Sequence, residues 1–261
     1  MADNYLEKKY EEYKSRKEGR TNHPYNGRKT TVIHKTRRVF VTGGAEGIGK
    51  AIVRAFRSAG HRVAFCDRNE AAGKETALQT GTSFFHVDVS DQEALENCMQ
   101  QIFKEWGDID IIINNAGISC FSPITETGVE DFDRILSVNL RPVFITSRRL
   151  AIHRQSQEAP NPFGRIVNIC STRYLMSEPG SEGYAASKGG IYSLTHALAL
   201  SLSQCHLDFS YTSNHFGELL LIHRKSRIRS TYTPIQNKML LENSSTQRNR
   251  GYRHRTRHRM I

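Results

Sequence analysis

A tyrosine and a lysine at a spacing suited to proton transfer occur in the segment GYAASKGG, as Tyr184 and Lys188. Residues four apart lie on the same face of a helix, so the two side chains would be neighbours. A free phenol, with a pKa of about 10, is a poor acid or base near neutral pH, but an adjacent ammonium favours the phenolate and lowers that pKa. Tyr184 is therefore a candidate for the proton transfer that accompanies hydride movement between an alcohol carbon and a nicotinamide.

A glycine-rich turn, TGGAEGIG, occupies residues 42–49 between the apolar run RVFV and the amphipathic stretch KAIVRAFRSAG. Its small residues would let backbone N–H groups and a helix N-terminus approach a pyrophosphate. Because the turn lies between a strand pattern and a helix pattern, it predicts a dinucleotide site.

The acidic residue Asp67 ends the next strand-like run, about twenty residues after the turn. Its carboxylate can accept hydrogen bonds from both hydroxyls of an adenosine ribose, and its charge would repel a 2′-phosphate. Glu46 in the turn adds negative charge, whereas Arg68 could meet a phosphate. Together these charges predict NAD as the cofactor, with NADP as the alternative.

The elements that must position these residues alternate from Arg38 onward. Short β-branched runs predict strands at 38–43, 62–67, 83–87, 109–114 and 165–170. Amphipathic stretches predict helices at about 47–59, 70–79, 91–106, 130–154 and 184–203. Parallel neighbours need a crossover helix, so the alternation predicts an α/β fold, a doubly wound parallel sheet of the Rossmann type with helices on both faces.

These motifs and their order resemble the short-chain dehydrogenase/reductase family from residue 38 to about residue 203. The glycine turn has the family's Thr-Gly-x-x-x-Gly-x-Gly form, Asp88-Val89 resembles its adenine-contacting segment, and Asn114-Asn115-Ala116-Gly117 resembles its sheet-stabilising segment. The cofactor-binding residues that the resemblance implies are Gly43, Glu46, Gly47, Ile48, Gly49, Asp67, Asp88, Val89, Asn115, Ala116, Gly117, Tyr184 and Lys188.

The same resemblance implies roles around the proton-transfer pair. Tyr184 would be the acid/base, and Lys188 would also hold the nicotinamide ribose. Ser171, at the end of a predicted strand and thirteen residues before Tyr184, matches the family's substrate-positioning serine. Asn139, in SVNLRPVF, matches the asparagine that holds a proton-relay water. The expected partners are a small alcohol/carbonyl substrate and, as in the intact family fold, further copies of the chain in a homodimer or homotetramer.

The segment after residue 203 departs from the resemblance. The family's sixth strand ending at Pro-Gly, its substrate lid and its seventh strand have no recognisable counterpart in residues 204–261, where the run FGELLLI is the candidate for a short helix or strand. We therefore expect the C-terminal strands to be missing and the strand at 165–170 to form a sheet edge. The simplest hypothesis is a reading frame shifted near codon 204, and the alternative is a divergent family tail.

Charge is distributed unevenly along the 261 residues, whose formal net charge is +11. Residues 1–38 carry a net +6, residues 39–203 a net −3, and residues 204–261 a net +8. This division predicts a basic, disordered extension at 1–37, an NAD-binding and catalytic domain at 38–203, and a basic tail over the remaining residues.

We expect an oxidoreductase that transfers a hydride between NAD(H) and a small alcohol or carbonyl compound, using Ser171, Tyr184 and Lys188. Sugar alcohols, 3-oxoacyl thioesters and steroid-like alcohols all fit the sequence as substrates. One alternative is a truncated or frame-shifted family member with impaired or no activity. Another is an NAD-binding scaffold whose basic tail, with arginines along 248–259, binds anions or nucleic acid, although we do not expect a nucleic-acid partner.

Membrane, secretion and metal signals are missing from the sequence. No apolar run is long enough to span a bilayer, and the charged N-terminus has no apolar signal core, which predicts a cytoplasmic protein without membrane contact. The five cysteines are widely spaced and lack a Cys/His ligand pattern, so we predict no metal site.

Overall fold

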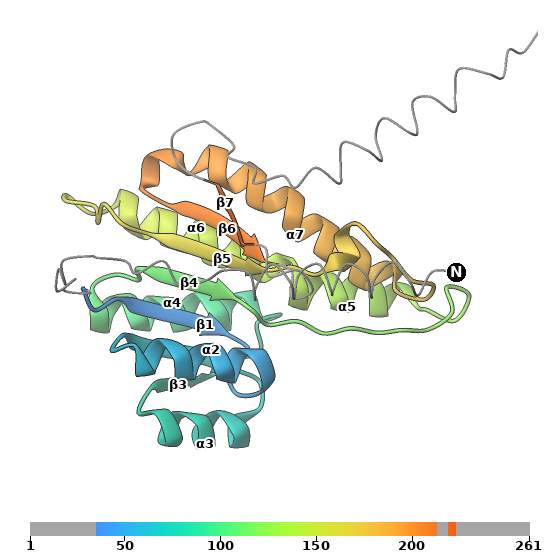
Figure 1. Ribbon diagram of the computed structural model, residues 1–261, viewed down its shortest axis with the longest axis horizontal. Helices are drawn as coiled ribbons and strands as arrows, with labels where there is room; N and C mark the ends of the chain where they lie inside the picture. Colours follow the sequence, from blue (N-terminus) through green and yellow to red (C-terminus); the bar gives the residue numbers. More distant parts are fainter. Residues whose placement is uncertain (1–34, 213–218, 223–261) are drawn as a thin grey trace, which may run out of the picture. The chain divides into compact units, whose positions relative to one another are not determined.

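The computed structural model describes residues 35–212 and, for the backbone only, residues 219–222. In this part of the chain a seven-stranded sheet has the order β3-β2-β1-β4-β5-β6-β7 (Figure 1). Strands β1 to β6 are parallel, and β7 is antiparallel to β6. The strands are β1 Arg38–Thr42, β2 Arg62–Asp67, β3 Ser83–His86, β4 Ile111–Asn114, β5 Arg165–Ile169, β6 Asp208–Thr212 and β7 Leu219–Ile222.

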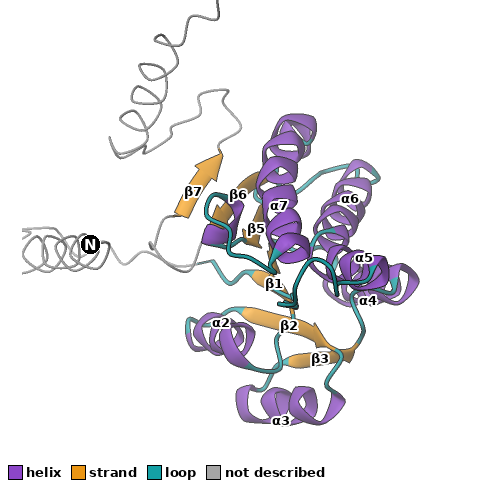
Figure 2. Ribbon diagram, turned by 90° about the vertical axis from the view of Figure 1, so that its right-hand side faces the viewer, coloured by secondary structure: helices purple, strands orange, loops and turns teal. Residues whose placement is uncertain are grey.

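Helices cover both faces of the sheet, with α2 and α3 on one face and α4 to α7 on the other (Figure 2). The predicted doubly wound parallel fold is thereby confirmed. In the described residues, none of these helices combines the length and the apolar character that a membrane span requires. The α-helices are α2 Gly47–Ser58, α3 Glu70–Thr80, α4 Gln92–Trp106, α5 Val129–Asn139, α6 Arg141–Gln155 and α7 Glu182–Ser201, and the 3-10 turns are η1 Thr172–Tyr174 and η2 Ser203–Cys205.

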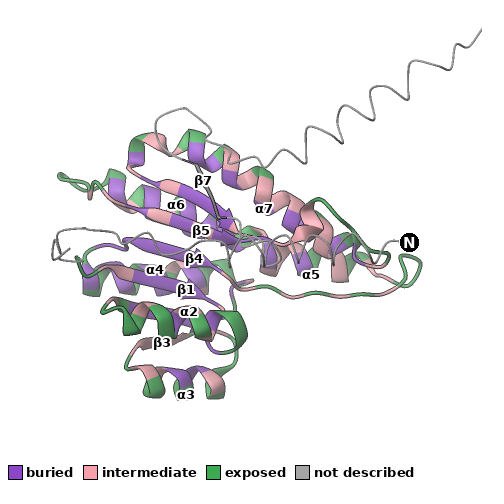
Figure 3. Ribbon diagram, in the orientation of Figure 1, coloured by how far each residue is buried: buried purple, intermediate pink, exposed green. Residues whose placement is uncertain are grey.

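Side chains alternate between the two faces of the sheet and form two hydrophobic clusters. In β1, Phe40 joins the cluster under α4, α6 and α7, whereas Val39 and Val41 join the cluster under α2 and α3. Strands that are covered on both faces must be apolar at successive positions, which explains the continuous runs in the sequence. The central strands are accordingly buried, the edge strand β3 is half-buried, and the exposed residues lie mainly on the helices and loops (Figure 3).

The predicted elements agree with the structure to within about two residues, except for the helix expected at 130–154. This segment forms two helices, because α5 ends at Asn139 and α6 begins at Arg141. Pro142 lies at the start of α6, where its missing N–H costs nothing, but it cannot continue the hydrogen bonding of α5.

The expectation that the sheet ends at β5 is wrong. Strand β6 pairs with β5 from Asp208 to Thr212, and β7 adds an antiparallel strand beside it. The apolar residues Leu207, Phe209 and Tyr211 occur at alternate positions and are buried, so HLDFSYT is a strand pattern that lacks only the family's Pro-Gly ending. The domain therefore continues past residue 203.

The two basic ends lie outside the described residues. Residues 1–34 contain most of the predicted extension, and residues 223–261 contain the arginine-rich part of the predicted tail. The extension, the anion-binding tail and the shifted reading frame stay predictions.

Candidate active site

The carboxyl end of β1 turns sharply into α2, and two glycines are required in this turn. Gly43 and Gly47 have φ angles of 66° and 53°, which residues with a side chain rarely adopt. A Cβ atom on Gly49 would lie 1.8 Å from the Gly43 carbonyl oxygen, so the first turn of α2 packs directly on the loop. The turn thus brings backbone, rather than side chains, to the N-terminus of α2.

The N-terminus of α2 lacks a side-chain cap. Its N-cap residue, Glu46, makes no cap hydrogen bond, and the first turn holds no acidic residue. By contrast, the side chains of Asn69 and Asp91 cap α3 and α4 by accepting from backbone N–H groups at 3.2 and 3.0 Å. Uncapped N–H groups and the helix dipole favour an anionic group at this position, and the pyrophosphate of a dinucleotide fits that requirement.

Asp67, the last residue of β2, is tied to the glycine turn. Its Oδ2 accepts a hydrogen bond from Ala45 N and its Oδ1 accepts one from Asn69 N, both at 3.0 Å. The Asn69 side chain also donates to Glu46 Oε2 at 3.2 Å, which holds a second carboxylate at this corner. A carboxylate oxygen has two acceptor sites, so each Asp67 oxygen retains one for a further donor such as a ribose hydroxyl.

A cavity of about 390 Å³ opens over the glycine turn and the carboxyl ends of β2 and β4. Arg68, Val87, Ile118 and Val138 contribute to its wall. The structure also brings eleven predicted cofactor residues together there: Gly43, Glu46, Gly47, Ile48, Gly49, Asp67, Asp88, Val89, Asn115, Ala116 and Gly117.

Three lining residues of this cavity were not predicted. Val87 directly precedes the Asp88-Val89 segment, so its place in the cavity wall could have been predicted from the sequence. Ile118 directly follows Gly117, so its place in the cavity wall could also have been predicted from the sequence. Val138 belongs to α5 and reaches the cavity only through the tertiary fold.

Asn115 joins the ends of β1 and β4 beneath the cavity. Its Nδ2 donates to the carbonyl oxygens of Thr42 and Gly43 at 3.1 and 2.9 Å, and its backbone N donates to Thr42 Oγ1 at 3.0 Å. These bonds hold the glycine turn against the loop that follows β4.

Asp88 lies exposed at the wall of the cavity after β3. Burial acts to raise the pKa of its carboxyl, but hydrogen bonds from Ser90 N and Ser90 Oγ, at 2.8 and 2.7 Å, outweigh that effect and lower the pKa. The side chain is therefore a carboxylate acceptor at neutral pH.

Lys188 on α7 is buried, with an exposed fraction of 4%. Its Nζ donates to the carbonyl oxygen of Ile169 at 2.8 Å and lies 5.5 Å from the centroid of the Tyr184 ring. Burial lowers the pKa of this ammonium to about 8, with Cys170 acting in the opposite direction. The predicted helical spacing thus brings the phenol ring and the ammonium together in the structure.

Ser171 follows β5 in an extended conformation at the start of η1. Its Oγ accepts a hydrogen bond from Arg173 N at 3.3 Å. The preceding Cys170 N donates to Thr212 O at 2.9 Å, so β6 helps to fix the backbone at this point. Within residues 35–212, no hydrogen bond joins the Ser171 hydroxyl to Tyr184 or Lys188.

Asn139 is buried at the end of α5 and connects two elements of the site. Its Oδ1 accepts from Ile118 N at 2.8 Å, while its Nδ2 donates to Ile118 O and Ser187 Oγ at 2.9 and 3.0 Å. Ser187 was not predicted, although its place beside Lys188 marks it in the sequence. In the structure the Asn139 side chain bonds to protein groups. Its role in holding a proton-relay water stays a prediction.

Gly117 lies where the cavity meets the Tyr184 helix. A Cβ atom there would be 3.3 Å from Asn139 Oδ1 and 3.8 Å from Lys188 Nζ. The cavity wall at Gly117 therefore approaches Lys188, although Tyr184 and Lys188 do not themselves line the cavity.

The order and geometry of these motifs agree with the sequence comparison. The short chain dehydrogenase family matches residues 37–210, about two thirds of the chain. The chain belongs to the short-chain dehydrogenase family. The match includes most of β6, in agreement with the sixth parallel strand of the sheet.

This member of the short-chain dehydrogenase family has relatives in bacteria and mammals. It is 37% identical over 172 residues to an uncharacterized oxidoreductase of Thermotoga maritima, covering 64% of this chain and 66% of that protein. It is 34% identical to the L-fucose dehydrogenase of Mus musculus (64% and 60% covered) and to the gluconate 5-dehydrogenase of Gluconobacter oxydans (62% and 64% covered). The chain spans less than two thirds of the length of these relatives.

Solved structures of other proteins share the fold. A mutant short-chain dehydrogenase/reductase of Serratia marcescens is 31% identical with a TM-score of 0.63, covering 68% of this chain and 73% of that one. An NAD⁺-bound xylitol dehydrogenase is 27% identical with a TM-score of 0.62, covering 68% and 69%.

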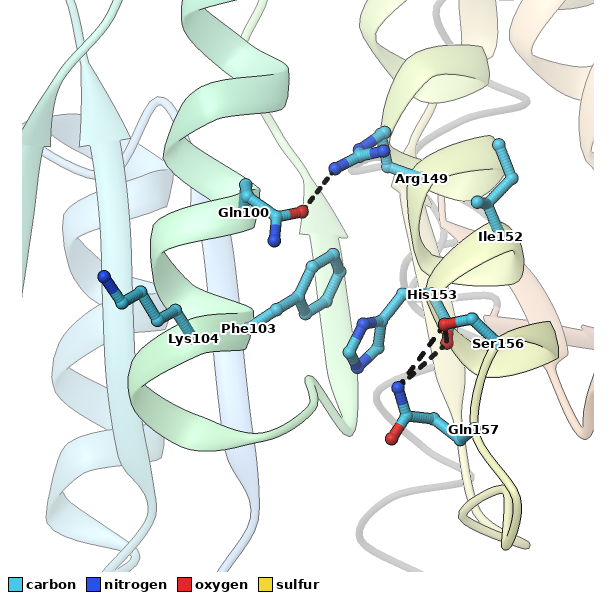
Figure 4. A pocket seen from close by; sticks show the side chains of 8 residues that line it. All are labelled: Gln100, Phe103, Lys104, Arg149, Ile152, His153, Ser156 and Gln157. Atoms are coloured by element: carbon cyan, nitrogen blue, oxygen red, sulfur yellow. Dashed lines mark hydrogen bonds between the residues drawn. The ribbon is translucent and has the colours of Figure 1, made fainter.

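A second cavity lies between α4 and α6, as Figure 4 shows. In it the rings of Phe103 and His153 stack 3.9 Å apart, and Arg149 donates to Gln100 Oε1 at 2.6 Å. The cavity lies toward the carboxyl ends of both helices and hence toward the amino edge of the sheet. Short-chain dehydrogenases, like other doubly wound proteins, bind ligands at the opposite edge, so this cavity is not the candidate active site.

Proposed function

We propose that this short-chain dehydrogenase transfers a hydride between NAD(H) and a small alcohol/carbonyl substrate, with Ser171, Tyr184 and Lys188 as its catalytic group. The observation that carries the proposal is the adjacency at Gly117, where the cavity over the glycine turn meets the buried ammonium of Lys188. Relatives named as sugar or polyol dehydrogenases support chemistry at a CH–OH carbon.

The nicotinamide, when bound, supplies the hydride acceptor or donor. In the direction of alcohol oxidation, the Tyr184 phenolate oxygen accepts the proton of the substrate hydroxyl. The Lys188 ammonium lies 5.5 Å from the centroid of the Tyr184 ring and so places a positive charge beside the group that exchanges the proton. In the reverse direction the Tyr184 hydroxyl donates the proton to the carbonyl oxygen.

Ser171 and Asn139 hold the geometry around that proton transfer. The Ser171 Oγ already accepts a hydrogen bond from Arg173 N, so its own O–H is left to donate to the substrate oxygen. Asn139 ties the loop after β4 to the helix that carries Tyr184 and Lys188. In this proposal Asn139 keeps its predicted role of holding a proton-relay water.

The charges around Asp67 favour NAD over NADP as the cofactor. A 2′-phosphate bound at Asp67 would meet two carboxylates, because the Asn69 side chain holds Glu46 at the same corner. The charge of Arg68, which also lines the cavity, offsets only part of this repulsion. We also propose that the protein is located in the cytoplasm and assembles as a homodimer or homotetramer.

The test is a fluorescence titration of the chain with NADH and with NADPH, followed by turnover assays of the Tyr184→Phe variant. NADH should bind at least tenfold more tightly, a difference of about 1.4 kcal/mol. The Phe variant should lose turnover and keep its NADH affinity within about twofold, since it lacks only the proton-transfer hydroxyl. Equal affinities would refute the role of Asp67, and a fully active Phe variant would refute the role of Tyr184.

A further inference from the structure

We propose that the substrate has an apolar body, such as an alcohol or ketone with a hydrocarbon chain or ring, and that Phe121 determines this specificity. The inference rests on the proposed function, because it concerns the substrate of that same site. An apolar substrate differs from the substrates for which several relatives are named, which are sorbitol, L-fucose and gluconate.

Large apolar side chains are exposed on the two loops beside Tyr184. Phe121 and Ile124, on the loop after β4, are 57% and 63% exposed. Leu175 and Met176, on the loop after Ser171, are 62% and 64% exposed. Exposed apolar residues grouped in this way mark a surface that binds an apolar partner.

The position of Phe121 relates this surface to the reacting atoms. Its ring centroid lies 6.3 Å from that of Tyr184, with an angle of 48° between the rings. A substrate oxygen that reaches the Tyr184 hydroxyl therefore brings the rest of the molecule close to Phe121. This proximity identifies the occupant of the surface as the substrate.

The two loops are joined, so their apolar side chains flank one site. Ser122 N donates to Gly180 O at 3.3 Å. A Cβ atom on Gly180 would lie 2.9 Å from Ser122 O, so the backbones approach closely at this point. Leu175 N and Met176 N both donate to Thr172 O, which keeps them in the turn that starts at Ser171.

Several polar side chains of these loops already bond to other groups of the same loops. Ser122 Oγ and Thr127 Oγ1 share a hydrogen bond of 2.7 Å, and Ser181 Oγ donates to Glu178 O. Arg173 forms an ion pair with Glu178. A polyol would need a partner for each hydroxyl that it buries, and a hydroxyl left without one opposes binding. An apolar body has no such requirement.

The experiment measures NAD⁺ reduction by the full chain with a series of 2-alkanols from 2-propanol to 2-octanol and with sorbitol and xylitol. We expect kcat/KM to rise about fourfold per added CH₂, the selectivity expected when each methylene is buried against apolar groups. Sorbitol and xylitol should react at least tenfold less well than 2-octanol. A flat series, or a preference for the polyols, overturns the inference while the proposed function stands.

Substitution of Phe121 tests its role against a matched phenylalanine. Phe121→Ser should lower kcat/KM for 2-octanol at least tenfold, change that for 2-propanol less than threefold and leave NADH affinity unchanged. Phe144→Ser is the control, because Phe144 is 48% exposed on α6, outside the two loops. Equal effects of the two variants would show that Phe121 does not determine specificity.

If no alcohol is turned over, that result contradicts the proposed function alone. A binding measurement then still decides the inference about the substrate. In the chain labelled with ¹³C-methyl methionine, and with the Met176 signal assigned from Met176→Leu, 2-octanone should shift that signal and sorbitol should not. Phe121→Ser should weaken the response to 2-octanone at least tenfold. If 2-octanone does not shift the Met176 signal, the inference is wrong. It is also wrong if the Met176 signal responds only to protein concentration, because that would indicate a contact between copies of the chain.

Discussion

The ammonium of Lys188 donates a 2.8 Å hydrogen bond to the carbonyl oxygen of Ile169, the last residue of β5. This bond joins the helix that carries Tyr184 to the strand that leads into Ser171. Because the ammonium is buried there, its pKa is lowered to about 8. The hydrogen bond thus fixes the ammonium on the helix that carries the proposed catalytic residue Tyr184, while burial lowers the ammonium's pKa.

The first prediction concerns stability and pH. The Lys188 pKa is about 8 in the folded chain against an ordinary value of 10.5, so between these values the unfolded chain binds more protons. The contribution of Lys188 to the free energy of unfolding therefore rises from pH 8 to pH 10.5, by on the order of 3 kcal/mol. In urea unfolding, Lys188→Met should have a higher free energy of unfolding than the wild type at pH 7, and this difference should shrink toward pH 10.

The control for this prediction is Lys104→Met, at an exposed position on α4. The free energy of unfolding of Lys104→Met should have the same pH dependence as that of the wild type. Titration of the tyrosines and of the cysteines other than Cys170, whose charge interacts with that of Lys188, is common to all three proteins and cancels in the comparison. A pH course for Lys188→Met that parallels the wild type would contradict the prediction.

A second prediction compares two glycines. In Gly49→Ala the new Cβ atom would lie 1.8 Å from Gly43 O, so the glycine turn must open and NADH affinity should fall at least tenfold. Gly189 lies inside α7 with no atom within 4 Å of its Cβ position. Gly189→Ala should raise the free energy of unfolding by about 1 kcal/mol and leave NADH affinity unchanged. NADH titration and urea unfolding of both variants test this, and tight NADH binding by Gly49→Ala would count against the prediction.

A third prediction concerns the buried Arg154 at the amino edge of the sheet. Its guanidinium donates to Asp108 Oδ2 at 3.2 Å and to the carbonyl oxygens of Ile109 and Phe163 at 2.8 and 2.9 Å. Arg154→Ala removes these hydrogen bonds and leaves Asp108 with donors from Asn161 and Arg38 only among the described residues, so it should cost about 3–5 kcal/mol of stability. Arg148→Ala, at an exposed residue of the same helix, should cost less than about 1 kcal/mol. Equal costs in urea unfolding would show that the buried network is not stabilising.

A fourth prediction concerns Tyr211 on β6. Its ring lies edge-on to Tyr192 at 5.0 Å and to Tyr174 at 6.0 Å, and the rings of Tyr174 and Tyr192 stack at 4.7 Å. Burial and the neighbouring tyrosines raise the pKa of the Tyr211 phenol well above its ordinary value. Because Tyr174 belongs to the turn after Ser171, Tyr211→Ala should raise the substrate KM as well as lower stability by about 3–5 kcal/mol.

Tyr211→Phe retains the ring, so it should cost only about 1 kcal/mol and leave KM within about twofold. Ser210→Ala, on the opposite side of the same strand and equally buried, is the control for KM. Urea unfolding and steady-state kinetics test these expectations. They would fail if Tyr211→Ala lowered stability without changing KM.

Much of the fold was predictable because its signals are local. The run RVFV followed by TGGAEGIG marks a strand, a tight turn and a helix within about fifteen residues, and the spacing of Tyr184 and Lys188 is one helical turn. The break at Leu140 was also marked locally by Pro142, but the amphipathic pattern on both sides obscured it. The strand β6 was missed because the family's Pro-Gly ending is absent there, although the alternation of Leu207, Phe209 and Tyr211 is present.

The sequence by itself determined the α/β class, the glycine turn and the pairing of a phenol with an ammonium, since each follows from periodicity or spacing along a few residues. Only the tertiary structure decided that Asn139 bonds to Ile118 and Ser187, and that the Lys188 ammonium is buried against Ile169. These contacts join residues that are between 19 and 48 positions apart. Burial and electrostatic environment are properties of the assembled sheet and helices, so no local pattern in the chain can specify them.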